Sequence, residues 1–126
     1  MRKISRSGSP FEKSIGFSRA CRVGSMICVS GTAPLDDGGH TVYQGDAYRQ
    51  TKRCLEISIK AIEELGGTFD GIIRTRIMLK DVHDWEAAAK AHGEIFSKLQ
   101  PACTFVEVKG FIDPEWLVET EIDCVV

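Results

Sequence analysis

The sequence of 126 residues contains no apolar run that approaches the roughly 20 residues needed to cross a bilayer. It has no CxxC pair, no GxGxxG motif and no Walker-type phosphate loop. The basic residues of the N-terminus are not followed by the apolar segment of a signal peptide. Sixteen basic and eighteen acidic residues give a net charge of −2, which creates no overall attraction to nucleic acid or to a membrane. We therefore expect a cytoplasmic protein.

The residues that are present have the proportions of a globular protein, with 43% apolar and 27% charged side chains. A chain of this length predicts a single domain over residues 1–126. Five cysteines are an odd number, which argues against a disulfide framework. Cys21 and Cys28 face each other if the chain turns at Gly24 and Ser25, and their expected Cα spacing of about 5.5 Å leaves a bridge open. Free thiols are the favoured alternative.

Alternating and helical periods divide the chain into elements. Residues 1–13 are polar and loop-like, with a short edge strand at 2–5. Residues 17–23 and 26–31 read as a hairpin. From Asp46 to position 65 the apolar period is that of a helix, capped by Asp46 and closed by two glycines. Its predicted buried stripe consists of Thr51, Cys54, Leu55, Ser58, Ile62 and Leu65.

The second half predicts one strand, one helix and a final hairpin. The strand at 71–80 alternates, so that one face carries Ile73, Thr75, Ile77 and Leu79 and the other carries Arg74, Arg76, Met78 and Lys80. A helix is expected from Asp84 to about position 99, where Pro101 prevents its continuation, with a buried stripe of Trp85, Ala88, His92, Ile95, Phe96 and Leu99. Residues 103–110 and 117–126 are predicted to form the final hairpin.

The resulting order, β-β-β-α-β-α-β-β, predicts an α+β sandwich in which two helices cover one face of a six-stranded sheet. The uncovered face carries an acidic row in the last strand, Glu119, Glu121 and Asp123. This row is either a solvated surface or the partner of the basic row on the strand at 71–80. A charged seam of the second kind is more plausible between subunits than on a free surface, and the sequence leaves both interpretations open.

Several stretches together resemble the Rid family, the reactive intermediate deaminases also called YjgF-type proteins. They are residues 15–34, 47–85, 91–96 and 100–108, with LVETEID at 117–123. Their distinctive features are VSG with a proline three residues on, GxxxD after the first helix, LKD after the following strand, and PAxxxVEV. The resemblance covers nearly the whole chain from Ile15 onward.

The resemblance implies a chorismate-mutase-like fold assembled as a barrel-like homotrimer, with a cleft for a small molecule at each subunit interface. Members of the best-known branch hydrolyse enamines and imines such as 2-aminoacrylate to a keto acid and ammonia. They use no metal or organic cofactor, and we expect none here.

When the site residues of the family are matched to this chain, the scaffold is retained and the residue that holds the substrate is changed. Glu119 matches the family's water-positioning glutamate, whereas Cys103 stands where the deaminases have the arginine that holds the substrate carboxylate. Phe17 replaces a usual tyrosine and Ala89 an asparagine. The resemblance thus implies catalytic positions at Glu119 and Cys103, and ligand-binding positions at Phe17, Arg19, Ser30, Gly31, Ala89 and Phe105.

Three functional interpretations follow. The first is a trimeric protein that binds a metabolite other than 2-aminoacrylate and either hydrolyses an imine-like bond or only binds. The second is a true deaminase in which Arg19 replaces the missing clamp, since it shares a strand face with Phe17. The third is RNA contact, because some relatives are described as endoribonucleases and residues 1–22 hold six Arg or Lys and one Glu. No aromatic-basic motif accompanies that basic excess, so nucleic acid is the least favoured partner.

Two further side chains have competing interpretations. Cys103 is either a nucleophilic or redox thiol at the cleft, or a small residue accepted at the start of a strand, and the second is favoured because no histidine is placed beside it. His92 lies on an apolar helical stripe, which favours a satisfied, half-buried histidine over a catalytic base.

Overall fold

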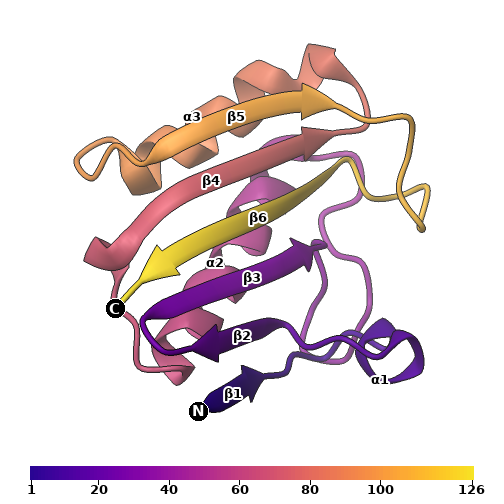
Figure 1. Cartoon of the computed structure of the whole chain (residues 1–126). Coiled ribbons are helices and arrows are strands. Elements are labelled where there is room, and N and C mark those ends of the chain that lie inside the picture. Colours follow the sequence, from indigo (N-terminus) through magenta and orange to yellow (C-terminus); the bar gives the residue numbers. More distant parts are fainter.

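The alternating segments of the chain join into one mixed sheet with the strand order β1-β2-β3-β6-β4-β5 (Figure 1). The computed structural model describes all residues 1–126. The strands are β1 (Arg2–Ser5), β2 (Ala20–Val23), β3 (Met26–Thr32), β4 (Ile72–Leu79), β5 (Ala102–Glu107) and β6 (Val118–Val125). The helices are α1 (Phe11–Ile15), α2 (Ala47–Glu64) and α3 (Trp85–Phe96), with 3-10 turns at Phe69–Gly71 and Val82–Asp84. No helix is long and apolar enough to cross a membrane.

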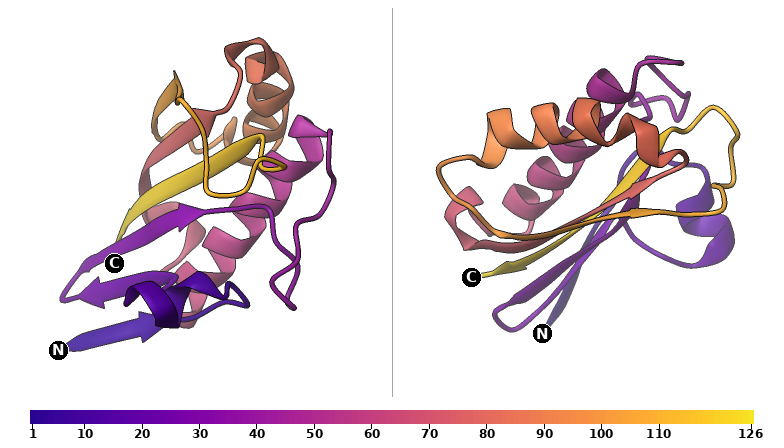
Figure 2. Two further views of the ribbon diagram at one scale, coloured as in Figure 1. Left: turned by 90° about the vertical axis from the view of Figure 1, so that its right-hand side faces the viewer. Right: turned by 90° about the horizontal axis from the view of Figure 1, so that it is seen from above.

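Helices α2 and α3 lie side by side on one face of the sheet, and the other face carries no second layer (Figure 2). The predicted α+β architecture is therefore confirmed. Helix α2 begins as expected, because the side chain of Asp46 accepts a hydrogen bond from the backbone N–H of Arg49 at 3.0 Å. It ends before Gly66, which adopts a φ of 84° that favours glycine. All six residues of its predicted stripe are buried.

The prediction for α3 was right about its start, where Asp84 is the N-cap residue, and wrong about its end. The helix stops at Phe96, before the expected position 99, and the chain turns at Gln100 with a φ of 56°. Trp85 is 50% exposed and therefore does not belong to the predicted buried stripe. The fully buried residues of α3 are Ala88, Ala91 and Phe96.

The predicted final hairpin does not exist. Strand β5 pairs in parallel with β4 at the sheet edge, and β6 inserts between β3 and β4, antiparallel to both (Figure 1). The two strands differ in what they can bury. Alternate residues of β6 are fully buried, whereas none of β5 is. A strand with a wholly buried face belongs in the middle of the sheet, and a strand without one tolerates the edge.

The alternation predicted for β4 is confirmed from Thr75 onward and fails at Ile73. The pairing of β4 with β6 shifts register between Ile72 and Arg74. Ile72 therefore lies on the helix-covered face, with 3% of its surface exposed, while Ile73 is 49% exposed. A single irregularity in a ladder exchanges the faces of the residues before it.

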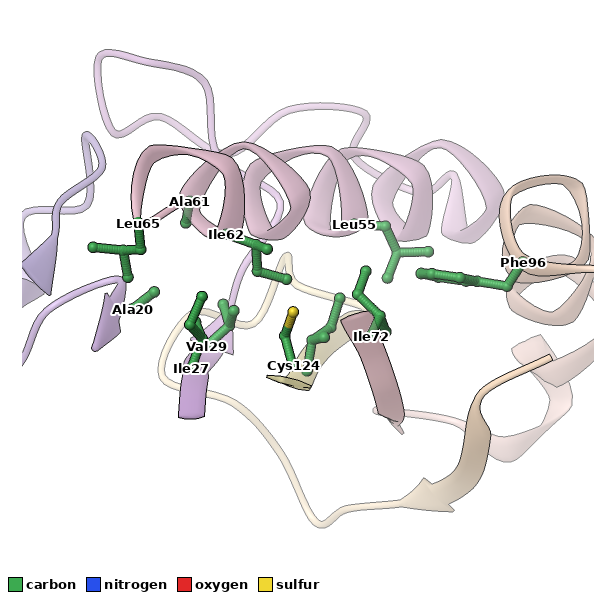
Figure 3. Packing of buried hydrophobic residues seen from close by; sticks show 11 residues of the cluster. Ala20, Ile27, Val29, Leu55, Ala61, Ile62, Leu65, Ile72, Phe96 and Cys124 are labelled. Atoms are coloured by element: carbon green, nitrogen blue, oxygen red, sulfur yellow. The ribbon is translucent and has the colours of Figure 1, made fainter. Parts of the chain in front are cut away.

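The main core lies between α2 and the sheet (Figure 3). Leu55, Ala61, Ile62 and Leu65 of α2 point toward the strands, and Phe96 of α3 closes one end. Facing them are Ala20, Ile27, Val29, Ile72, Ile122 and Cys124. All five cysteines are free thiols, as expected, although Cys21 and Cys28 do face each other across β2 and β3.

The uncovered face carries the two charged rows in adjacent strands. Arg76 Nη1 lies 3.1 Å from Glu121 Oε1, and Arg74 Nε lies 3.8 Å from Asp123 Oδ2. The predicted pairing of the rows is confirmed for these two pairs. Lys80 departs from it, because its Nζ donates to the carbonyl oxygen of Pro114 at 2.6 Å.

Candidate functional site

A cavity of about 340 Å³ lies between the N-terminal arm, α2 and the ends of β3 and β6. Its roof is the arm at residues 5–9, which packs closely on the loop at 33–37. A Cβ at Gly8 would lie 2.1 Å from the carbonyl oxygen of Asp37, so only glycine allows this approach. The lining mixes apolar, charged and other polar residues, and among the apolar ones Phe11 and Trp116 meet edge to face with ring centroids 6.2 Å apart.

Glu119 of β6 is one of the acidic residues that line this cavity. It lies beside the strand end of β3, where a Cβ at Gly31 would be 3.2 Å from Glu119 Oε1. The carboxylate has no hydrogen-bond or ion-pair partner within the chain. Its burial raises the pKa, the charge of Arg19 opposes this shift, and Glu121 adds to it. A half-buried, unpaired carboxylate of raised pKa is suited to proton transfer.

Arg19 also lines the cavity, although only 3% of its surface is exposed. Its Nη2 lies 3.3 Å from Oε2 of Glu12, which is 2% exposed. Its Nη1 donates to the carbonyl oxygen of Gly31 at 2.6 Å and to Oγ1 of Thr32 at 3.0 Å. The guanidinium also lies 5.5 Å from the ring centre of Phe17. Arg19 is therefore bound within the chain rather than available as a free clamp.

Glu12 is a functional candidate that the sequence reasoning missed, together with the helix that carries it. Residues 1–13 were expected to be loop-like, but α1 forms and turns Glu12 inward. The Glu12 carboxylate accepts from the backbone N–H of Ser7 at 3.1 Å as well as pairing with Arg19. The available signal was that Glu12 is the only acidic residue among the first 22.

The predicted site residues fall into two groups within one chain. Phe17, Arg19, Gly31 and Glu119 line the cavity. Ser30 does not, and its Oγ donates to the carbonyl oxygen of Ser18 at 2.7 Å. The remaining three, Ala89, Cys103 and Phe105, belong to α3 and β5 at the opposite edge of the sheet.

At that opposite edge, Cys103 is exposed and Phe105 is half-buried. The ring of Phe105 lies 6.1 Å from that of His92 and packs against a second core cluster, which consists of Cys54, Ile77, Leu79, Ala88 and Val118. His92 is half-buried, lies 2.8 Å from Thr75 Oγ1 through its Nε2, and has a pKa lowered by burial. This confirms the structural interpretation of His92. No group of three or more His, Cys, Asp or Glu side chains is arranged to hold a metal ion.

The chain is a small α+β protein with a cavity beside its sheet, and comparison with known proteins identifies its family. Residues 9–126 match the family described as Endoribonuclease L-PSP. The chain belongs to that family, which confirms its resemblance to the Rid or YjgF-type proteins.

Three relatives illustrate the range of the family. The chain is 40% identical over 119 residues to the uncharacterized protein SCO2049 of Streptomyces coelicolor, covering 94% of this chain and 87% of the relative. It is 32% identical over 100 residues to the 3-aminoacrylate deaminase RutC of Acinetobacter baylyi, covering 79% of each. The crystal structure of Rv2704 from Mycobacterium tuberculosis superposes with a TM-score of 0.89 at 35% identity over the full length of both chains.

Proposed function

We propose that the protein binds a small metabolite in the cavity beside Glu119 and hydrolyses an imine or enamine bond there, releasing a carbonyl compound and ammonia. The observation that carries the proposal is the carboxylate of Glu119, which lines the cavity and has no hydrogen-bond or ion-pair partner within the chain. The relative named 3-aminoacrylate deaminase supports this reaction type.

The reaction needs one group that moves a proton twice. Glu119 accepts a proton from water as the water oxygen bonds to the carbon of a protonated imine, and the π pair of the C=N bond moves to nitrogen. Glu119 then returns this proton to the nitrogen of the resulting carbinolamine, the C–N bond breaks, and the hydroxyl proton passes to the departing ammonia, so that the carbonyl forms and ammonium leaves. Burial raises the pKa of Glu119 toward the range in which one carboxyl group performs both transfers.

We also propose that the complete cleft forms between copies of the chain. Within one chain, Cys103 and Phe105 lie at the sheet edge opposite the cavity. A second copy that places its β5 edge against the cavity of the first would unite the two groups. The homotrimer implied by the family resemblance provides such a closed arrangement, in which every copy supplies both halves.

The metabolite in this proposal differs from 2-aminoacrylate, because Cys103 is uncharged where the deaminases hold a carboxylate with arginine. Losing a charge-assisted hydrogen bond at a desolvated site costs about 2–5 kcal/mol. That free energy corresponds to roughly 30- to 4,000-fold in affinity or rate. Arg19 compensates poorly for this loss, since Glu12 and the Gly31 carbonyl occupy its donors.

The test is ammonia release from freshly generated 2-aminoacrylate and from a panel of imines without a carboxylate. We expect weak activity of the wild type on 2-aminoacrylate, a gain in Cys103→Arg, and loss of all imine hydrolysis in Glu119→Gln. Full wild-type activity on 2-aminoacrylate contradicts the clamp argument. Hydrolysis that survives Glu119→Gln contradicts the catalytic role of this residue. A monomer in light scattering contradicts the shared cleft.

A further inference from the structure

The charges that line the cavity are unequal in number. The cationic side chains at its wall are Arg6, Arg19, Arg53 and Lys60, and the acidic ones are Asp36, Asp37, Glu56, Glu64 and Glu119. Glu12 lies directly behind Arg19, which makes four cations against six acids. Near the mouth these charges pair with one another, since Arg53 lies 3.4 Å from Asp37 and 4.0 Å from Glu56. A ligand therefore meets a formal excess of two negative charges.

Part of this excess of negative charge lies in the inner part of the cavity. Its buried cation, Arg19, pairs with Glu12, which also lies 4.0 Å from the more exposed Arg6, and the Nη1 of Arg19 is held by the Gly31 carbonyl and Thr32. Glu119 has no such partner. Lys60, the one lining cation without a carboxylate partner, is exposed at the mouth, where water and salt screen its charge. The charge that remains available to a bound ligand is that of Glu119.

The apolar part of the lining offers a surface for an apolar ligand body. Phe17 lies next to the guanidinium of Arg19, and the edge-to-face pair of Phe11 and Trp116 forms another part of the lining. Such surfaces favour hydrocarbon or aromatic groups. A free carboxylate placed among them beside Glu119 would be desolvated next to a like charge.

We infer that this cavity takes ligands that combine an apolar body with a cationic or neutral nitrogen beside Glu119, that it rejects carboxylates, and that Glu12 sets this preference by neutralising Arg19. The inference deepens the proposed function and rests on it for the reaction: the substrate is then a protonated imine that lacks a neighbouring carboxylate. The binding preference itself is measurable without any turnover.

Three probes of similar size test the preference: benzylamine, which is a cation at pH 7, benzyl alcohol and benzoate. We would titrate each into the wild-type protein and follow affinity by calorimetry and the amide signals of Gly8 and Gly31 by NMR. Because a charge-assisted contact replaces like-charge repulsion, we expect benzylamine to bind at least about tenfold more tightly than benzoate, a difference of about 1.4 kcal/mol. In Glu119→Gln this advantage disappears. Equal or tighter binding of benzoate overturns the inference, as does the absence of binding by all three.

The role of Glu12 has its own test. In Glu12→Gln the freed Arg19 is expected to turn the preference toward benzoate. The double variant Glu12→Gln/Arg19→Gln, which leaves no buried charge, retains the preference for benzylamine and remains informative if the single variant does not fold. Glu63→Gln removes the same charge from an exposed position of α2 outside the cavity and serves as the control. A folded Glu12→Gln that still prefers benzylamine overturns the assignment to Glu12.

The two proposals fail in different ways. Tight binding of benzylamine without ammonia release from any imine contradicts the proposed function and leaves the ligand preference standing. Ammonia release from carboxylate-bearing imines, combined with a preference for benzoate, supports the proposed function and overturns this inference.

Discussion

The two edges of the sheet stabilise their surroundings in different ways. At the edge of β1 and β2, the N-terminal arm and α1 close over a polar interior in which Glu12 and Arg19 are buried together. At the edge of β5 the stabilising contacts are aromatic, because the ring of Phe105 lies against that of His92 under α3. The cavity lies on the side of the first edge, with Glu119 contributed by the central strand β6, and the second edge supplies an exposed strand and a neutral thiol. The two parts of the implied site lie apart within one chain, which is why we propose a cleft between copies.

The largest loss of stability is expected for Glu12→Ala, which breaks the buried ion pair at the first edge. The change leaves Arg19 buried without a counter-ion and removes the partner of the Ser7 amide. Removing one partner of a buried ion pair costs about 3–5 kcal/mol. We expect a loss of that size in the free energy of unfolding from urea denaturation. Glu63→Ala, on the exposed side of α2, is the control, and a loss for Glu12→Ala no larger than that of the control contradicts the buried pair.

The opposite edge is expected to respond to pH through His92. Its burial lowers the pKa, so the folded state binds the proton more weakly than the unfolded chain does. Stability therefore falls as the pH drops below about 6.5, the ordinary histidine pKa, until the lowered pKa of the folded state is passed. Thermal melts between pH 8 and pH 5 should show this loss in the wild type and a smaller one in His92→Gln.

His83 provides the matched control with the opposite sign. It is exposed in the turn before α3, and its hydrogen bond with Asp81 raises its pKa. It therefore contributes stability below the ordinary histidine pKa that is lost as the pH rises through the raised value. His83→Gln should make the acid loss slightly steeper than in the wild type. Equal pH profiles for the two variants would contradict the assignment of the effect to His92.

These predictions depend on residues that local patterns identify with unequal success. The cap at Asp46, the α2 stripe and the alternation of β6 follow from short-range periodicity and were predicted. The place of β6 between β3 and β4 was not, because strand pairing depends on which distant segment offers a matching buried face. The Glu12–Arg19 pair was missed for a similar reason, since seven residues and a tight turn at Gly16 separate partners that meet only after folding.

The charged rows lie on the inner strands β4 and β6, and a smaller effect tests whether a second copy of the chain covers them. Within one chain, Arg76 and Glu121 are partly exposed, so their coupling in a double-mutant cycle should be about 0.2–1 kcal/mol. If this face is instead buried between copies, removing Arg76 alone leaves an unpaired buried charge and costs about 3–5 kcal/mol. The cycle should be measured at several protein concentrations, because only the second case makes the loss depend on concentration.

The smallest expected effect concerns Glu119 and has the reverse sign. Its raised pKa means that burial disfavours the charged carboxylate, so the group destabilises the fold at neutral pH and this penalty disappears as the pH falls below its raised pKa and toward the ordinary value. Glu119→Gln should therefore raise the melting temperature at pH 7, and the gain in the free energy of unfolding should be within about 1 kcal/mol. The gain should shrink on acidification. A loss of stability in this variant would mean that the carboxylate has a partner, and the case for Glu119 as a free acid would fail. Together with lost imine hydrolysis in the same variant, a gain would identify a residue kept for chemistry at the expense of stability.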